Sequence, residues 1–129
     1  MMQAALLLAL ALSSGLAAAG PQPDAQAAYR LGLMHRNGDG VPKDAAHAAS
    51  LIRSAAQGQL PAAMFTLSNM LAAGEGVMRD ELAARRWLDD AAALGYPPAL
   101  QQLALTEPDP RKAELLMRQA AHALQHASE

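Results

Sequence analysis

The sequence predicts an all-α protein built from repeated pairs of helices. Two observations carry this prediction, the composition and a repeat of 36 residues that runs through most of the chain. Of 129 residues, 32 are Ala and 21 are Leu, and only four are aromatic. Ala and Leu lose little conformational freedom in a helix, whereas strands favour Val, Ile and Thr. The length suits one compact domain.

Charge and cysteine content exclude several functions. The formal net charge is -2, whereas a surface that binds nucleic acid needs clustered Lys and Arg to displace counterions. The chain contains no Cys, so a disulfide framework, a thiolate zinc site and a cysteine nucleophile are all absent. We therefore expect no nucleic-acid partner.

The first 19 residues have the pattern of a secretory signal peptide. No charged side chain precedes Asp24, and an apolar run over residues 6–12 leads to a Ser-Ser-Gly step. Ala17 and Ala19 supply the small side chains that signal peptidase requires beside its cut. We predict cleavage after Ala19, which directs the protein to the periplasm or outside the cell, and a linker over residues 20–24.

Two alternatives to a cleaved signal remain. The leader contains no Lys or Arg, so residues 1–19 could instead hold the protein at a membrane, or the start could be placed too early. A continuous span needs about 20 apolar residues, and the Ser-Ser-Gly step interrupts this segment. We therefore favour export with cleavage.

Three copies of the repeat follow, over residues 25–60, 61–96 and 97–129. The third copy is seven residues short, all of them missing from its central loop, so the chain holds about 2.5 repeats. The offset of 36 joins these pairs: Leu31/Leu67, Gly38/Gly74, Gly40/Gly76, Val41/Val77, Asp44/Asp80, Ala48/Ala84, Leu51/Trp87 and Ala55/Ala91. A fixed period of this length is typical of stacked helical repeats.

The first helix of each copy is marked by its start and by one small residue. Pro61 and Pro97 open the second and third of these helices, where a missing N–H removes no needed donor. Gly32, Ser68 and Ala104 share one position, and their small side chains would let neighbouring helices approach closely. Two glycines around one acidic residue then form each loop, over residues 37–41 and 73–77. These loops lack the further ligands of a calcium loop, so we interpret them as tight turns.

The second helix of each copy begins at an aspartate: Asp44, Asp80 or Asp109. An aspartate there caps free N–H groups and suits the positive end of the helix. Apolar residues 4, 7, 8, 11 and 12 positions later form one helical stripe. We expect Gly58 and Gly95 to end these helices in the left-handed conformation. The final helix, from residue 109 to about residue 127, is predicted to cap the stack, and the residues expected to pack inward are Leu115, Leu116 and Met117.

These residues carry a resemblance to a known family. The pattern Tyr-x-Leu-Gly-x-Met, Gly-Val, Asp, Ala and Ala-Ala on a 36-residue period resembles the Sel-1-like repeat (SLR) family, which is related to the tetratricopeptide repeats. In the first copy the motif residues are Tyr29, Leu31, Gly32, Met34, Gly40, Val41, Asp44, Ala48, Ala55 and Ala56. The resemblance implies an α-solenoid of antiparallel helix pairs whose concave face is lined largely by first-helix side chains. It also implies a scaffold or adaptor, as in bacterial envelope assembly or signalling.

Positions of the first helices outside the motif are the candidate partner-binding surface, because repeat packing leaves them free. We call them the strip, and its members are Arg30, Leu33, Arg36, Thr66, Asn69 and Gln102. Amides and guanidinium groups of this kind can bind the backbone and a carboxylate of a peptide or partner protein. The leading hypothesis is thus a non-enzymatic interaction module exported to the envelope.

No residue set assembles a catalytic, metal or cofactor site in the sequence. His122 and His126 lie four residues apart without a third ligand, and His35 and His47 are isolated. Gly-x-Ser-x-Gly and Ser-x-x-Lys motifs are absent. We therefore expect no enzyme activity, no cofactor and no small-molecule substrate. The alternatives are a cell-wall or β-lactam hydrolase, which rests on family analogy alone, and a self-assembling subunit, since solenoids usually need about three repeats.

Overall fold

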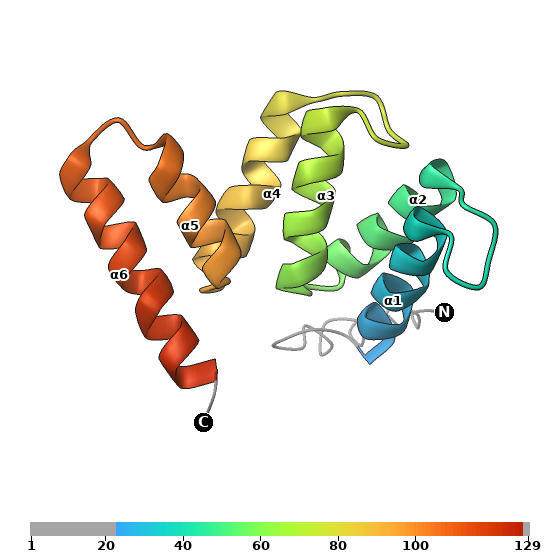
Figure 1. Cartoon of the computed structure of the whole chain (residues 1–129), viewed down its shortest axis with the longest axis horizontal. Coiled ribbons are helices and arrows are strands. Elements are labelled where there is room, and N and C mark those ends of the chain that lie inside the picture. Colours follow the sequence, from blue (N-terminus) through green and yellow to red (C-terminus); the bar gives the residue numbers. More distant parts are fainter. Residues whose placement is uncertain (1–22, 128–129) are drawn as a thin grey trace, which may run out of the picture.

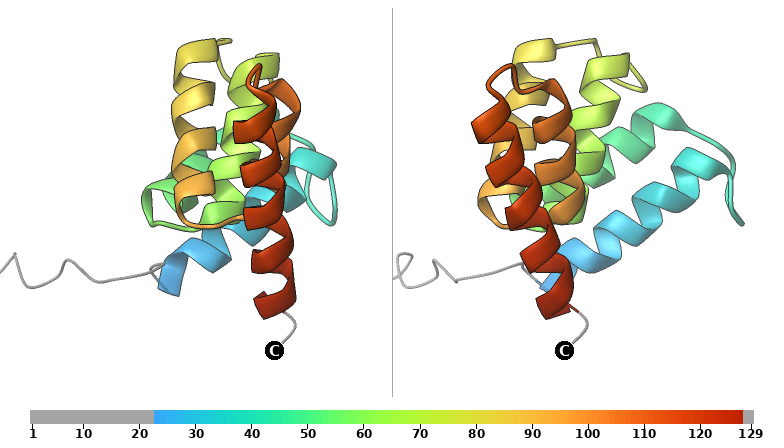
Figure 2. Two further views of the ribbon diagram at one scale, coloured as in Figure 1. Left: turned by 90° about the vertical axis from the view of Figure 1, so that its left-hand side faces the viewer. Right: turned by 60° about the vertical axis from the view of Figure 1, so that its left-hand side comes forward.

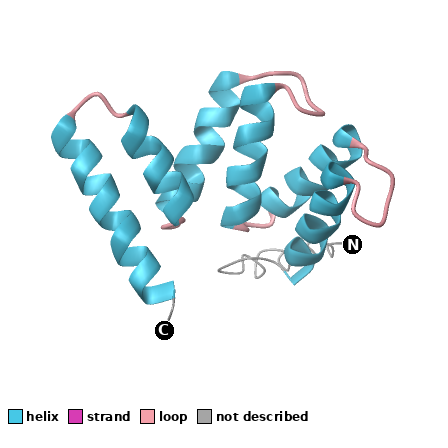
Figure 3. Ribbon diagram, in the orientation of Figure 1, coloured by secondary structure: helices cyan, strands magenta, loops and turns pink. Residues whose placement is uncertain are grey.

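The computed structural model describes residues 23–127. Within this range the chain forms α-helices and no strand (Figure 3). The helices are α1 (Pro23–Asn37), α2 (Ala45–Gln57), α3 (Pro61–Ala73), α4 (Glu81–Ala93), α5 (Pro97–Thr106) and α6 (Pro110–Ala127). The predicted signal peptide, residues 1–19, lies outside the described residues, and α1 begins inside the segment predicted as a linker over residues 20–24.

The helices form three antiparallel pairs that stack in sequence order. Figure 1 shows α1–α2, α3–α4 and α5–α6 along a curved row with α4 between α3 and α5, and Figure 2 shows the same pairs from two other sides. The main contacts join each helix to its neighbours in sequence, which is the arrangement of a solenoid. The predicted all-α solenoid is therefore confirmed. None of the described helices has the length and apolar character needed to cross a bilayer.

The predicted caps of the second helices are confirmed. The carboxylates of Asp44 and Asp80 each accept a hydrogen bond, at 3.0 Å, from the backbone N–H three residues further on. The Asp109 carboxylate accepts one at 2.9 Å from the N–H of Arg111. Each cap satisfies a donor that the first helical turn leaves without an internal partner.

The ends of α2 and α4 correct one prediction. Gly95 is left-handed, with φ +80°, as expected after α4. Gly58 has a φ of −81°, and the left-handed residue after α2 is Gln59, with φ 70°. Position 58 requires a small residue for another reason: a Cβ there would lie 3.0 Å from the Cβ of Ala25 in α1. The glycine therefore allows close packing rather than a positive φ.

Small side chains let the helices approach closely. A Cβ on Gly32 would lie 2.7 Å from Cγ1 of Ile52, so α1 and α2 touch at this point. At the matching position of the second pair, the Ser68 hydroxyl donates a 2.7 Å hydrogen bond to the backbone carbonyl of Ala84. The close approach predicted for these positions is confirmed. The largest fully buried side chains are Ile52, Leu67 and Met70, and most of the remaining core is alanine.

The prediction that α6 caps the stack with three inward side chains is wrong. Leu116 is half-buried and packs against the core, but Leu115 is 55% exposed and Met117 is 47% exposed. Met117 occupies the position that Ile52 and Leu88 hold in the first two copies, where both are buried. Those two are covered by the next helix pair, whereas no described element covers α6. Apolar side chains of α6 therefore remain exposed at this edge of the described stack.

The loop between α3 and α4 packs on the first repeat. Gly76 in this loop has a φ of +70°, and a Cβ there would lie 2.1 Å from the carbonyl oxygen of Ala45, at the start of α2. Gly40, its counterpart in the first copy, has a similar φ of +75°, but the nearest atom to its Cβ would be the Met34 methyl at 3.9 Å. The two glycines thus share a conformation and differ in what surrounds them.

This difference predicts unequal effects of one substitution. We expect Gly40→Ala to lower the free energy of unfolding by about 1–2 kcal/mol, the cost of the left-handed conformation. Gly76→Ala should cost about 3 kcal/mol or more, because the methyl group also meets the backbone of Ala45. Urea denaturation followed by circular dichroism measures both. Equal losses in the two variants would contradict the close packing of the loop.

Candidate functional site

The strip lies on α1, α3 and α5, but its members differ in exposure. Arg30, Thr66 and Gln102 occupy one position in three successive copies. The first is exposed, the second is only 7% exposed and the third is half-buried. Leu33 and Asn69 form a second row and are half-buried.

Thr66 is tied into the fold by two hydrogen bonds. Its Oγ1 donates to the carbonyl oxygen of Ala62 at 2.9 Å, within α3, and lies 2.9 Å from the Tyr29 hydroxyl of α1. Since one hydroxyl proton is used within α3, the phenol of Tyr29 is the donor in the second contact. This residue therefore links α1 to α3 and offers little surface to a partner.

Arg36 is tied into the fold by an ion pair with Glu75. The guanidinium Nε and one terminal nitrogen donate to the two carboxylate oxygens, at 2.7 and 2.9 Å. These hydrogen bonds, and the attraction between the charges, raise the pKa of Arg36 and lower the pKa of Glu75. The pair joins the end of α1 to the loop that also holds Gly76, so this loop is fixed to the first repeat at two points.

The other polar members of the strip are available to a partner. Arg30, Asn69 and Gln102 make no side-chain hydrogen bond or ion pair with any residue in the range 23–127. Leu33 lies beside them on α1 and packs against the core. A cation, two amides and a half-buried apolar side chain thus remain along the first helices.

Three aromatic side chains on or next to the first helices lie outside the predicted strip. Tyr29, Phe65 and Tyr96 are half-buried, and the Phe65 and Tyr96 ring centres lie 5.7 Å apart. Burial, with a smaller effect of Tyr29, raises the pKa of Tyr96. Tyr96 lies outside the register of the other two, because it aligns with Leu60. The sequence signal for Tyr96 is the replacement of an aliphatic residue, Leu60 in the first copy, by an aromatic one.

The histidines form two pairs, one of which the sequence did not predict. His35 and His47, treated as isolated, have ring centres 4.5 Å apart. His122 and His126 have ring centres 4.4 Å apart on the surface of α6. Among the described residues, no three His, Cys, Asp or Glu side chains gather in a way that could hold a metal ion.

Comparison with known sequences agrees with the repeat register. The sequence model of the Sel1 repeat family matches residues 25–59, 61–96 and 100–123. The chain belongs to the Sel1 repeat family. No curated protein matches it with significance. Sel1 repeat proteins are generally protein–protein interaction modules and typically non-catalytic scaffolds.

Solved Sel1 repeat proteins have the same fold. One from Oxalobacter formigenes is 28% identical with a TM-score of 0.73, and the match covers 79% of this chain and 46% of that one. A protective antigen present in uropathogenic Escherichia coli strains, which displays an SLR fold, is 31% identical with a TM-score of 0.69. That match covers 76% of this chain and 22% of the antigen. This chain therefore spans less than half the length of either relative.

The Arg36–Glu75 ion pair predicts a pH-dependent contribution to the stability of this Sel1 protein. Because the pKa of Glu75 is lower in the folded chain, the pair stabilises the fold above the ordinary glutamate pKa of about 4.3. This contribution is lost as the pH falls through the lower folded value. At pH 7, Glu75→Gln should lower the free energy of unfolding by about 0.5–1 kcal/mol, and the loss should be smaller at about pH 3.

Urea denaturation at both pH values measures this difference. The matched control is Glu114→Gln, which removes an exposed pair with Arg118 on α6 and should cost less than about 0.5 kcal/mol. If Glu75→Gln costs the same at neutral and acid pH, the carboxylate charge does not hold the loop.

Proposed function

We propose that this chain is a non-enzymatic interaction module of the bacterial envelope, which binds a peptide or partner protein along the strip. The observation that supports it most is the set of free polar side chains on the first helices, Arg30, Asn69 and Gln102, beside half-buried aromatic rings. The guanidinium of Arg30 can bind a carboxylate, and the amides can bind backbone groups of an extended chain. The fixed first and second repeats supply a rigid base for these contacts.

The test places a photo-crosslinking residue at position 30 or 69 and, as a control, at position 86. Arg86 is exposed on α4, a second helix, so it reports on the surface behind the strip. In the native host we expect the same saturable adduct from positions 30 and 69 and none from position 86. Equal capture from position 86 would reject the strip as the binding surface.

Charge reversal then measures the contribution of Arg30. With the captured partner purified, Arg30→Glu should weaken binding about tenfold, whereas Arg86→Glu should leave the affinity within about twofold. Both residues are exposed, so neither change should alter the thermal melting curve. Unchanged affinity in Arg30→Glu would remove this residue from the site.

Export is the second part of the proposal, and it rests on residues 1–19. An apolar run, a helix-breaking step and the small pair Ala17 and Ala19 are the features that signal peptidase reads. A Sel1 interaction module delivered in this way would meet its partner in the periplasm.

Blocking the cut tests this part. We expect the wild-type protein in the periplasmic fraction with Gly20 as its first residue, and we expect Ala19→Phe to accumulate as the uncut precursor. Mass spectrometry of the purified protein distinguishes the two. Wild-type protein that keeps residues 1–19 would contradict cleavage, and its recovery from the membrane fraction would favour the anchor instead.

A further inference from the structure

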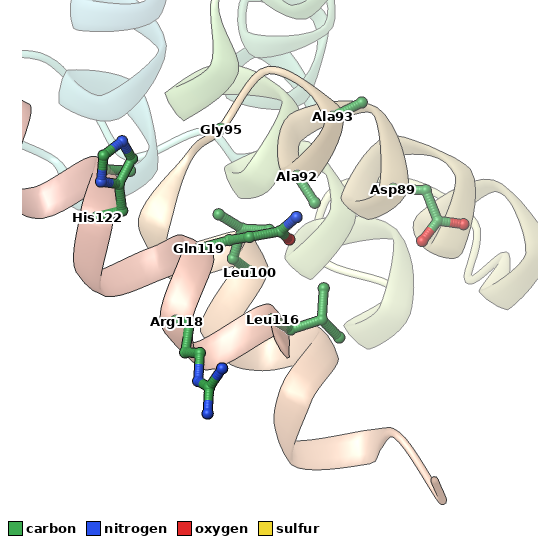
Figure 4. Close-up of a pocket in the computed structure, with 10 residues that line it drawn as sticks. Asp89, Ala92, Ala93, Gly95, Leu100, Leu116, Arg118, Gln119 and His122 are labelled. Atoms are coloured by element: carbon green, nitrogen blue, oxygen red, sulfur yellow. The ribbon is translucent and has the colours of Figure 1, made fainter. Parts of the chain in front are cut away.

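A groove of about 660 Å³ lies between α4, α5 and α6 (Figure 4). Its floor is apolar and includes Ala92, Leu100 and Leu116. The polar side chains that line it are Asp89, Arg118, Gln119 and His122. The groove is built mainly from second helices, so it does not involve the free side chains of the strip.

The same groove occurs one repeat earlier, between α2, α3 and α4, with a volume of about 380 Å³. The lining residues correspond through the repeat: Ala56 with Ala92, Met64 with Leu100, and Trp87 with Leu116. Trp87 is half-buried and packs against the core. The smaller groove thus holds an indole ring at the position where the larger one has only the shorter Leu116 side chain.

The charged side chains that line the larger groove also bear on which chemical groups it can bind. The Asp89 carboxylate is bound by Arg85 at 3.0 Å, and Arg118 binds Glu114 at 2.6 Å. Each of these charged side chains already has an ion-pair partner in its own helix, so the lining favours an uncharged guest over a charged one. An uncharged guest with a large apolar surface fits this lining best.

We propose that the α4–α6 groove binds the indole ring of a tryptophan from a partner protein. The guest takes the place beside Leu116 that the larger side chain of Trp87 fills in the preceding repeat. The Gln119 amide points across the groove towards α4 in Figure 4 and makes no hydrogen bond with another described residue. Its carbonyl oxygen can accept a hydrogen bond from the indole N–H, and a buried tryptophan usually has such an acceptor.

The probe is N-acetyl-tryptophanamide, followed by NMR on the full mature chain. We expect saturable shifts with a dissociation constant on the order of 1 mM, as suits one side chain, and intermolecular NOEs to the Leu100 and Leu116 methyl groups. N-acetyl-leucinamide should bind at least about fivefold more weakly, since it lacks the aromatic surface and the ring N–H.

Two matched variants locate the guest. Leu116→Trp supplies the ring from the chain itself, as in the preceding repeat, and should weaken binding of the probe at least about tenfold. Leu115→Trp makes the same change at an exposed neighbour and should leave binding within about twofold. Should Leu116→Trp fail to fold, the wild-type NOEs still decide whether the ring enters the groove.

The proposal is overturned if the probe gives no saturable shifts, if its NOEs lie elsewhere, or if leucinamide binds equally well. Equal binding by a folded Leu116→Trp variant would also overturn it. These results leave the strip untested, because photo-crosslinking at positions 30 and 69 involves other residues. Failure at either surface is therefore distinguishable from failure at the other.

Discussion

Close contact between helices through alanine and glycine is the constraint on which this structure depends. A single helix pair of this length cannot bury its own apolar stripe, so each pair must press against the next. Gly32 and Ser68 hold the contact within their pairs, and alanines such as Ala55 and Ala91 are fully buried. Larger side chains at these positions would separate the layers and leave voids, which interiors tolerate poorly.

This mode of packing explains where free surface remains. Many of the repeated apolar residues are buried by stacking, whereas several positions that vary between copies stay exposed or line the contacts between pairs. Arg30 and Asn69 are available on the first helices for this reason. Trp87 and Leu116 illustrate this on the second helices, where they line two corresponding grooves of about 380 and 660 Å³.

The sequence predicted the frame well because periodicity reports packing directly. The 36-residue register located the helix pairs, the aspartate caps and the small residues at the closest contacts. Contacts between copies were harder, because a motif defines one repeat and is silent on its neighbours. Arg36 and Thr66 therefore seemed free, although Glu75 and Tyr29 from adjacent repeats bind them. Met117 was expected to pack inward by analogy with Ile52, but burial at that position requires a following pair.

The missing loop of the third copy has a mechanical consequence. The loop after α3 fastens the first two repeats together through Glu75 and Gly76. Between α5 and α6 only residues 107–109 remain, so the third pair brings no such fastening to the second. The joint at α4 and α5 therefore lacks the ion pair and the loop packing that connect the first two repeats, and we expect it to be the least stiff joint. We therefore expect the solenoid to change its curvature at this joint, by a rotation of the α5–α6 pair against the first two repeats.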